Sequence, residues 1–216
     1  MVNYPAANTG WAIDAADLNG DSRTDAVSLH QYGYANPNFS VFLQNASGTL
    51  NTAVPYDLGS VNGESLSAGD VNGDEKADVV MTYGGNIPYS TLAVFAQRTD
   101  GTLQLDHLYN AYQIPGEVKI ADVNNDGRED VIISHNLWYR MSVSVQLENG
   151  LLAAYQLYPI TYNSSRFDIG DINGDSFPDA VFADYSQGLI ILYHTVDPLA
   201  TPIPTRTPTN TRTPTP

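Results

Sequence analysis

The sequence predicts an all-β fold, a β-propeller of four four-stranded antiparallel blades. Three observations indicate it: an acidic nine-residue stretch occurs four times, a short β-branched run follows each copy, and helical periodicity is absent throughout. The copies begin at positions 17, 70, 122 and 171, so their starts lie 53, 52 and 49 residues apart. A fixed period of about 50 residues is typical of propellers and solenoids. Four units of four short strands fit a four-bladed propeller.

Each acidic stretch joins two predicted strands. A half-apolar run such as 11–16 precedes it, and a β-branched run such as 26–29 follows it. A third strand is predicted further on, as at 39–44. In the first three repeats a Gly-bearing turn with a leucine comes next, as at 45–50, and then a strand with a tyrosine, as at 54–58. Short apolar runs bounded by turn residues favour strands over helices.

The two ends of the chain predict how the ring closes. The last repeat passes from its third strand into a Pro/Thr tail, whereas the chain begins with MVNYPAA, which is similar to the fourth-strand segments. Tyr4 lies 13 residues before Asp17, the spacing that Tyr109 and Tyr158 also have to the next acidic stretch. We therefore expect the N-terminal strand to close the last blade and to cover an exposed sheet edge. A closed four-bladed monomer is the first interpretation; an eight-bladed ring of two chains and an excerpt from a longer array remain open.

Composition limits the domain organisation and the partners. The formal net charge is −15, with 24 acidic and 9 basic residues, which argues against nucleic acid or an anionic membrane as partner. Apolar runs stay well below the ~18 residues of a membrane span, so no membrane span is expected. The N-terminus lacks the basic and apolar regions of a signal peptide. Residues 1–197 are expected to form the propeller, and residues 198–216 an extended Pro/Thr-rich linker or stalk.

The acidic stretches have the ligand pattern of a hard-cation site. Side-chain oxygens at positions 1, 3 and 5, a backbone carbonyl at position 7 and a carboxylate at position 9 can surround one ion. Calcium fits better than magnesium because the loop offers many protein oxygens in flexible geometry, and transition metals would favour His or Cys. An EF-hand is excluded because position 12 carries no Glu and the flanks are strands. A metal-free Asx-rich turn is the alternative, but four such loops would be destabilised by their own carboxylates.

At this point the pattern resembles the FG-GAP or VCBS repeat, the calcium-bearing blade of integrin-α-type propellers and of many bacterial surface proteins. The family motif, D-x-[ND]-x-D-G-x-x-D, lies between the first two strands of a blade, and the resemblance covers residues 1 to about 197. It implies up to four Ca²⁺ ions, one per blade, as components of the folded state. The implied ligands are Asp17, Asn19, Asp21, the Arg23 carbonyl and Asp25; Asp70, Asn72, Asp74, the Lys76 carbonyl and Asp78; Asp122, Asn124, Asp126, the Arg128 carbonyl and Asp130; and Asp171, Asn173, Asp175, the Phe177 carbonyl and Asp179.

The loops depart from the family motif at positions 4 and 6. Only the third loop has the family's glycine at position 6, Gly127, where the others have Ser22, Glu75 and Ser176. Those three loops carry glycine at position 4 instead, and Asn125 takes that place in the third loop. Because Asn tolerates left-handed backbone geometry, we expect the loop shape to survive, with unequal affinities.

The resemblance places the remaining loops on the opposite face of the ring. These loops are rich in aromatic side chains, which could stack on a carbohydrate or contact a protein ligand. The alternative is that the tyrosines pack between blades with their hydroxyls at the rim. His30 and His135 share one repeat position, either as a polar ring near the axis or as a repeated feature of the rim. The candidate ligand-binding residues are Tyr32, Tyr34, Tyr83, Tyr89, Trp138, Tyr139 and Tyr162.

The sequence contains no pattern of a catalytic site. No Ser-His-Asp or Cys-His set is recognisable, and no close carboxylate pair lies outside the acidic loops, so an enzyme is not expected. The Thr/Pro tail is typical of O-glycan acceptors at cell surfaces, and a bare spacer is the alternative. Asn38, Asn45 and Asn163 lie in Asn-x-Ser sequons. The candidate glycosylation sites of the tail are Thr205, Thr207, Thr209, Thr211 and Thr213.

These observations predict a secreted protein of the extracellular space or cell surface. Its expected function is that of a calcium-stabilised propeller serving as a binding, adhesion or display module on a Thr/Pro stalk, with a carbohydrate or protein ligand. The alternative is a self-assembling structural subunit of a surface layer or extracellular filament, whose partner is the chain itself. Rigid-loop sites with dissociation constants of about 0.1–1 mM would suit extracellular calcium.

Overall fold

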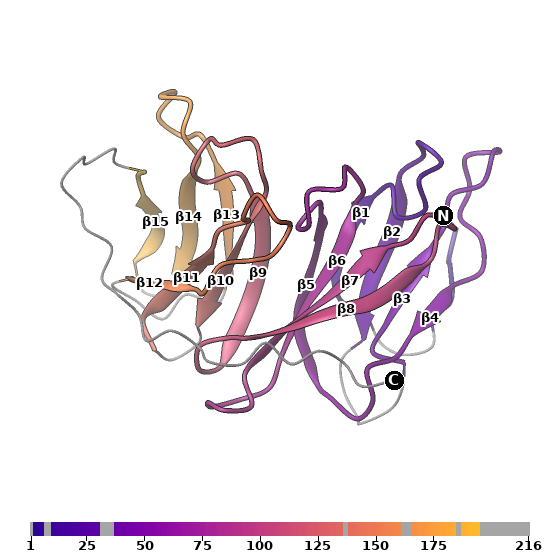
Figure 1. Cartoon of the computed structure of the whole chain (residues 1–216), viewed down its shortest axis with the longest axis horizontal. Helices are drawn as coiled ribbons and strands as arrows, with labels where there is room; N and C mark the ends of the chain where they lie inside the picture. The colour runs from indigo at the N-terminus through magenta and orange to yellow at the C-terminus, as the bar shows by residue number, and fades with distance from the viewer. Residues whose placement is uncertain are drawn as a thin grey trace.

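The structure is a computed structural model that describes residues 2–6, 10–30, 37–135, 138–160, 166–184 and 187–194. In these ranges the chain forms fifteen β-strands and no helix, in four antiparallel sheets arranged as the blades of a four-bladed β-propeller (Figure 1). The predicted all-β propeller fold is therefore confirmed. Within the same ranges no helix has the length and apolar character needed to cross a membrane. The tail at 198–216 lies outside the described residues, so its role as a linker stays a prediction.

Each of the first three blades contains four strands, hydrogen-bonded in chain order. Blade one consists of β1 (Gly10–Ala16), β2 (Asp25–His30), β3 (Phe39–Phe42) and β4 (Val54–Tyr56). Blade two consists of β5 (Gly63–Gly69), β6 (Asp78–Tyr83), β7 (Thr91–Gln97) and β8 (Leu103–Asn110). Blade three consists of β9 (Pro115–Ala121), β10 (Asp130–His135), β11 (Arg140–Ser144) and β12 (Gln156–Pro159). Blade four consists, in its described residues, of β13 (Arg166–Gly170), β14 (Asp179–Asp184) and β15 (Gly188–Leu192).

The acidic loops are the tight connections of the first hairpin in every blade. In blade one the small residue Ala16 ends β1 and pairs with Asp25, the last residue of the loop motif. The other blades repeat this register, for example with Gly69 opposite Asp78. All four loops therefore lie at one edge of the molecule, while the β4–β5, β6–β7 and β8–β9 connections lie at the other edge (Figure 1).

The apolar core lies between neighbouring blades rather than within one sheet. In β6, Val79 and Met81 belong to the cluster shared with blade one, whereas Val80 belongs to the cluster shared with blade three. A strand that is buried on both faces has a continuous run of apolar residues, as the sequence has at 79–81. Each fully buried aliphatic side chain of this kind contributes about 1.5–3 kcal/mol through the hydrophobic effect.

In the inner strand of each blade, the residue four positions before the acidic loop shows whether a preceding blade packs against that strand. A junction where it does is called filled. Leu66 in β5, Val118 in β9 and Phe167 in β13 are at most 4% exposed, and each packs in a cluster with residues of the preceding blade. Ile13 occupies the same position in β1, four residues before the acidic loop, and is 81% exposed. The face of blade one that would contact a preceding blade is therefore open at Ile13.

The N-terminal segment does not close the last blade as the sequence predicted. Residues 2–6 form no strand, and the Tyr4 hydroxyl accepts a hydrogen bond from the backbone N–H of Leu50 in blade one at 3.2 Å. Figure 1 shows the start of the chain beside blade one, at the opposite end of the molecule from β15. Blades one and four touch near the axis, where the Arg166 guanidinium lies 5.8 Å from the centre of the Trp11 ring. The segment is held by blade one, because Tyr4 finds the same kind of partner there that later tyrosines find at filled junctions.

Candidate metal centre

The four acidic loops share one backbone shape. Positions 4 and 6 have a positive φ in every copy, a conformation that residues other than Gly and Asn adopt rarely. Asn125 takes this conformation with φ of 56°, as expected for its residue type. The left-handed residues are Gly20, Gly73, Asn125 and Gly174 at position 4, and Ser22, Glu75, Gly127 and Ser176 at position 6. A common loop shape thus persists even where position 6 has a side chain that strains it.

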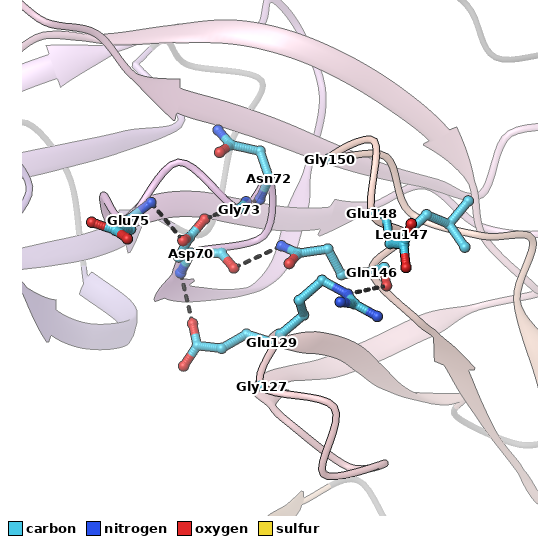
Figure 2. Close-up of a pocket in the computed structure, with 11 residues that line it drawn as sticks. Asp70, Asn72, Gly73, Glu75, Gly127, Glu129, Gln146, Leu147, Glu148 and Gly150 are labelled. Carbon is cyan, nitrogen blue, oxygen red and sulfur yellow. Dashed lines mark hydrogen bonds between the residues drawn. The ribbon is translucent and has the colours of Figure 1, made fainter.

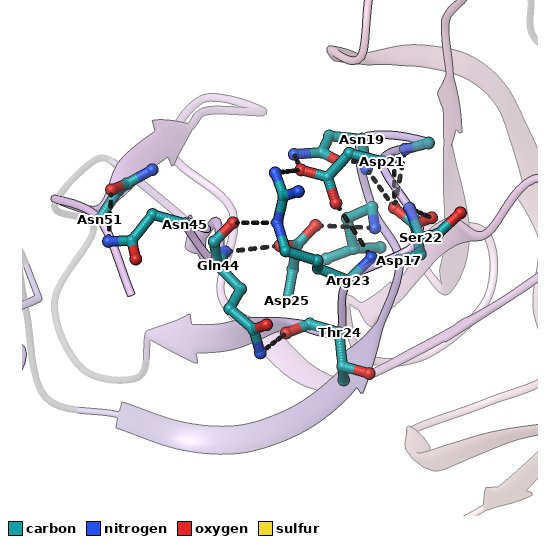
Figure 3. A network of polar contacts seen from close by, with 12 residues as sticks. Asp17, Asn19, Asp21, Ser22, Arg23, Thr24, Asp25, Gln44, Asn45 and Asn51 are labelled. Atoms are coloured by element: carbon teal, nitrogen blue, oxygen red, sulfur yellow. Dashed lines mark hydrogen bonds and ion pairs between the residues drawn. The ribbon is translucent and has the colours of Figure 1, made fainter. Parts of the chain in front are cut away.

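The first aspartate of each loop organises the turn through backbone N–H groups. In loop one, the Asp17 carboxylate accepts hydrogen bonds from Gly20 at 2.7 Å, Asp21 at 3.1 Å and Ser22 at 2.6 Å (Figure 3). Burial works to raise the pKa of Asp17, but these backbone hydrogen bonds outweigh it, so the pKa lies below its usual value. Backbone N–H groups also lower the pKa of Asp171 in loop four. Both carboxylates are therefore held in their ionised form.

Position 7 supplies an internal counterion in three of the loops. A basic side chain there pairs with the carboxylate at position 5, which compensates part of the charge of the loop. In loop four the position is taken by Phe177, whose ring stacks on His194 with 4.8 Å between centroids. Loop four therefore carries its three aspartates without a basic residue at position 7. The pairs in the other loops are Arg23 with Asp21, Lys76 with Asp74 at 2.9 Å, and Arg128 with Asp126 at 2.5 Å.

The aspartate at position 9 is buried and ties the loop to the third strand of its own blade. The Asp25 carboxylate accepts hydrogen bonds from the backbone N–H of Gln44 at 2.7 Å and of Leu18 at 2.9 Å. Burial raises the pKa of its counterpart Asp78 to about 7, and the nearby negative charges of Asp74 and Asp70 act in the same direction. From the end of the third strand, the residues that donate a backbone N–H to position 9 are Gln44, Gln97, Gln146 and His194.

The glutamines at the ends of the third strands were not identified as site residues from the sequence. The Gln97 side chain donates from Nε2 to the backbone carbonyl of Asp17 in the preceding loop at 2.9 Å, and to Ala77 in its own loop at 3.2 Å. Gln146 makes the equivalent contact to the Asp70 carbonyl at 2.9 Å. The sequence feature that could have identified them is the recurrence of Gln at the end of the third strand in the first three repeats. Through these side chains, one blade positions the loop of the blade before it.

A cleft of about 500 Å³ lies between the second acidic loop and blade three (Figure 2). On one side, the Glu129 carboxylate accepts a hydrogen bond from the backbone N–H of Asp70 at 2.6 Å. Burial raises the pKa of Glu129 above its usual value. Gln146 holds the carbonyl of the same aspartate, so both backbone groups of Asp70 are fixed by blade three. The first predicted ligand of loop two is thus held by the neighbouring blade.

The donor chemistry of the loops fits a hard cation, although the carboxylates are not gathered around one point. Among the described residues, no three His, Cys, Asp or Glu side chains form a group that could hold a metal ion. All side-chain donors at positions 1, 3, 5 and 9 are oxygens, the type that calcium prefers. The Asp25 carboxylate uses two hydrogen bonds of the roughly four that an ionised carboxylate can accept. The carboxylate at position 9 of loop one thus keeps lone pairs for a cation.

The predicted aromatic residues within the described ranges lie at the end of β6 and in the β6–β7 and β10–β11 connections of blades two and three. Tyr89, Trp138 and Tyr139 are exposed, and Tyr83 is half-buried. The ring of Tyr112, which was not predicted, lies 6.5 Å from that of Trp138 in an edge-to-face contact. Its sequence signal was only its place in a connection between blades. Tyr32, Tyr34 and Tyr162 lie outside the described residues.

The two histidines of the shared repeat position are buried. His135 lies between the Ser142 hydroxyl, 2.7 Å from Nε2, and the Gln113 carbonyl, 3.2 Å from Nδ1. Burial lowers the pKa of His135 to about 4, and it also lowers the pKa of His30. His30 contacts the Pro37 carbonyl through Nδ1 at 3.2 Å. Both side chains are neutral packing residues of the repeat.

The predicted glycosylation sites are partly outside the described residues. These include Asn163 and the tail threonines Thr205, Thr207, Thr209, Thr211 and Thr213. Asn38 is buried, and its amide donates to the Val61 carbonyl at 2.9 Å, so the sequon at this position is not available for a glycan. The Asn45 side chain caps a turn by accepting from the backbone N–H of Ser47 at 3.0 Å.

The fold and the loops define the class of the protein, a repeat β-propeller with one aspartate-rich hairpin in each blade. A comparison with protein-family models matches the FG-GAP-like repeat at residues 17–81, 70–133 and 122–182. Each matched unit begins at one acidic loop and runs through the next one to the strand that follows it. The chain belongs to the FG-GAP-like repeat family. A comparison with curated proteins gives no match.

Proposed function

We propose that the protein is an extracellular, calcium-stabilised propeller that binds a carbohydrate or protein ligand on the face opposite the acidic loops. The family and the fold make it a binding or adhesion type of module. The observation that carries the proposal further is the exposed aromatic surface of Tyr89, Trp138 and Tyr139. Exposed aromatic side chains on a rigid scaffold are typical of binding surfaces for sugars and proteins.

The backbone of two blades supports this surface. Ile114 donates its N–H to the Gly85 carbonyl at 2.7 Å, which joins the connection after blade two to the β6–β7 loop that carries Tyr89. The same connection contains Tyr112, whose ring contacts Trp138 in blade three. The aromatic residues therefore lie on connected segments rather than on independent loops. A ligand that stacks on them would lose little affinity to ordering of the loops.

A direct test uses the two tryptophans of the chain. In a Trp11→Phe variant, Trp138 is the remaining fluorophore and reports on the aromatic surface. We expect glycans or protein ligands found on an array to shift its emission, and Trp138→Ala to abolish their binding. Tyr158→Ala, an exposed aromatic on the outer strand β12, is the matched control and should leave binding unchanged. Binding that survives Trp138→Ala would contradict the assignment of this face.

Calcium is the second part of the proposal. Asp25, Asp78 and Asp130 are fully buried, and burial raises the pKa of each, so their ionised forms are destabilised without a nearby cation. A cation held by positions 1, 3, 5, 7 and 9 would remove that penalty. In loop four, whose position 7 is Phe177, no basic residue at that position offsets the aspartates. We expect this loop to depend on calcium most.

The calcium test is a thermal melt in calcium, in magnesium and with a chelator. For a dissociation constant of about 1 mM, about 10 mM free calcium adds about 1.4 kcal/mol per site to the free energy of unfolding. Asp171→Asn should reduce this gain, whereas Asp168→Asn removes the same charge from an exposed side chain outside the loop and should not. A melting temperature that is the same in calcium and in chelator would refute the role of calcium.

The extracellular location and the stalk rest on the sequence. Dissociation constants of about 0.1–1 mM would keep the loops occupied outside the cell, where calcium is abundant. The intact mass of the protein from its native source tests the tail. A series of hexose-containing masses would support glycosylation at the threonines of 201–216, and an unmodified mass would favour a bare spacer.

A further inference from the structure

The two ends of the blade array expose apolar positions that are buried at every filled junction. At the end formed by blade one, here called the leading end, Ile13 is 81% exposed, although its counterparts Leu66, Val118 and Phe167 are buried. At the end formed by blade four, here called the trailing end, Leu189 in β15 is 66% exposed. The strand registers place it in the same position as Leu92 in β7 and Met141 in β11, which are buried. Both end faces are therefore built like junctions, but they meet each other near the axis, at Trp11 and Arg166, and leave Ile13 and Leu189 exposed.

The two exposed positions belong together. At the filled junctions the trailing residue of one blade and the leading residue of the next lie in one apolar cluster. These pairs are Phe39 with Leu66, Leu92 with Val118, and Met141 with Phe167. By the same repeat, Leu189 and Ile13 are the pair that an additional junction would bury.

Blade one, at the leading end, also holds the N-terminal segment of residues 2–6, which forms no strand in the structure. The Tyr4 hydroxyl accepts from the Leu50 N–H at 3.2 Å, as the Tyr56 hydroxyl does from Leu103 and the Tyr109 hydroxyl from Leu152, both at 3.2 Å. Tyr56 and Tyr109 belong to the outermost strands, β4 and β8, of the preceding blade. Residues 2–6 thus stand where the outermost strand of a preceding blade would stand. Blade four, in its described residues, has three strands and β15 at its edge.

We propose that a second copy of this chain docks head to tail on the open end of blade four. Its Ile13 packs against Leu189, and its residues 2–6 lie beside β15 as the fourth strand of the blade. The segment of the same chain is held by blade one at the far end of the molecule (Figure 1). A second copy brings the complementary face without rearranging the three packed junctions. Such heterologous contacts produce either closed rings or open filaments.

A polar contact should accompany the apolar one. At two filled junctions, Gln97 and Gln146 donate to the first carbonyl of the preceding acidic loop, both at 2.9 Å. Their counterpart Gln44 is half-buried and donates within its own blade to Thr24 at 3.1 Å. In the docked pair, Gln44 of one copy would reach the Asp171 carbonyl of the other. The interface therefore reproduces the contacts of an internal junction, and it rests on neither calcium nor the proposed ligand.

Cross-linking between single-cysteine variants tests the proposal, because the chain has no native cysteine. Ile13→Cys and Leu189→Cys chains are mixed in calcium and treated with a short bismaleimide. We expect cross-linked pairs that contain one chain of each kind. Ile87→Cys, an exposed isoleucine of the β6–β7 loop, replaces Ile13→Cys in the control and should give none. Absence of the mixed pair would overturn the proposal, as would an internal cross-link in a monomeric chain that carries both cysteines.

The mass of the particle in solution gives an independent readout. Light scattering should give at least twice the 23.4 kDa of one chain for the wild type, and about half that particle mass or less for Ile13→Asp. Ile87→Asp should leave the mass unchanged. Because the Ile13 side chain is exposed in the single chain, Ile13→Asp should still fold. The circular dichroism spectrum of this variant should therefore match that of the wild type. A discrete dimer or a filament would both support the head-to-tail contact, and a wild-type monomer at high concentration would refute it.

Discussion

The clearest quantitative prediction compares two residues at the same repeat position. Leu66→Ala removes a side chain that is 4% exposed and packs between blades one and two. Loss of its buried methyl and methylene groups, together with the cavity that remains, should lower the free energy of unfolding by about 2–5 kcal/mol. Ile13→Ala makes an equivalent truncation at a site that is 81% exposed in the single chain. Its effect should stay within about 0.5 kcal/mol.

Urea denaturation in calcium measures this difference. For a domain of this size, an m-value of about 2–3 kcal/mol/M converts a loss of about 3 kcal/mol at Leu66 into a midpoint lower by about 1–1.5 M. The Ile13→Ala midpoint should match the wild type at low protein concentration, where the chains are separate. It should fall below the wild type at high concentration, where docked copies bury Ile13. Equal losses for both variants in dilute monomer would refute the reasoning, because they would mean that blades one and four pack together.

Three further predictions concern protonation, backbone strain and the contacts between blades. His135 has a pKa of about 4 in the fold and about 6.5 in the unfolded chain, so unfolding takes up a proton between these values. Between pH 7 and pH 4, His135 alone should therefore lower the free energy of unfolding by up to about 3 kcal/mol, whereas the raised pKa of Asp78 acts in the opposite direction. The measurement is therefore the difference in unfolding free energy between the wild type and His135→Gln, which should change over this pH range. Glu75→Gly should add about 0.5–1 kcal/mol in chelator by relieving a φ of 64°, whereas Gly127→Ala, at φ of 84°, should destabilise. Gln146→Ala should cost about 1–2 kcal/mol because it leaves a carbonyl of the preceding blade without its donor, and Gln44→Ala, which lacks that contact, should cost less in a monomer.

The sequence was sufficient to predict most of the local structure. The four acidic stretches became the four hairpin loops, and the β-branched runs became the second strands, because both patterns act within a few residues. Asn125 was expected to take the left-handed conformation of a glycine, and it does. The calcium sites themselves stay predictions, since their ligands are inferred from the family motif and its oxygen donors.

The sequence was not sufficient to predict the roles that depend on the next blade. The tyrosine spacing was recognised, but Tyr4 was assigned to the last blade rather than to its partner Leu50 in blade one. The glutamines after the third strands were not recognised as contacts to the preceding loop. Asn38 matches a glycosylation sequon and is buried. In each case the deciding partner lies many residues away and leaves no local pattern.

The sequence by itself determined that this protein is a chain of four similar β-units, each with an aspartate loop. It did so because strand alternation, turn residues and a period of about 50 residues are properties of neighbouring residues. Only the tertiary structure decided that Leu66 is buried and Ile13 exposed, although both are aliphatic residues at one repeat position. The physical reason is that burial is set by the blade that packs against a residue, and no blade packs against the first blade at Ile13 or against the last blade at Leu189.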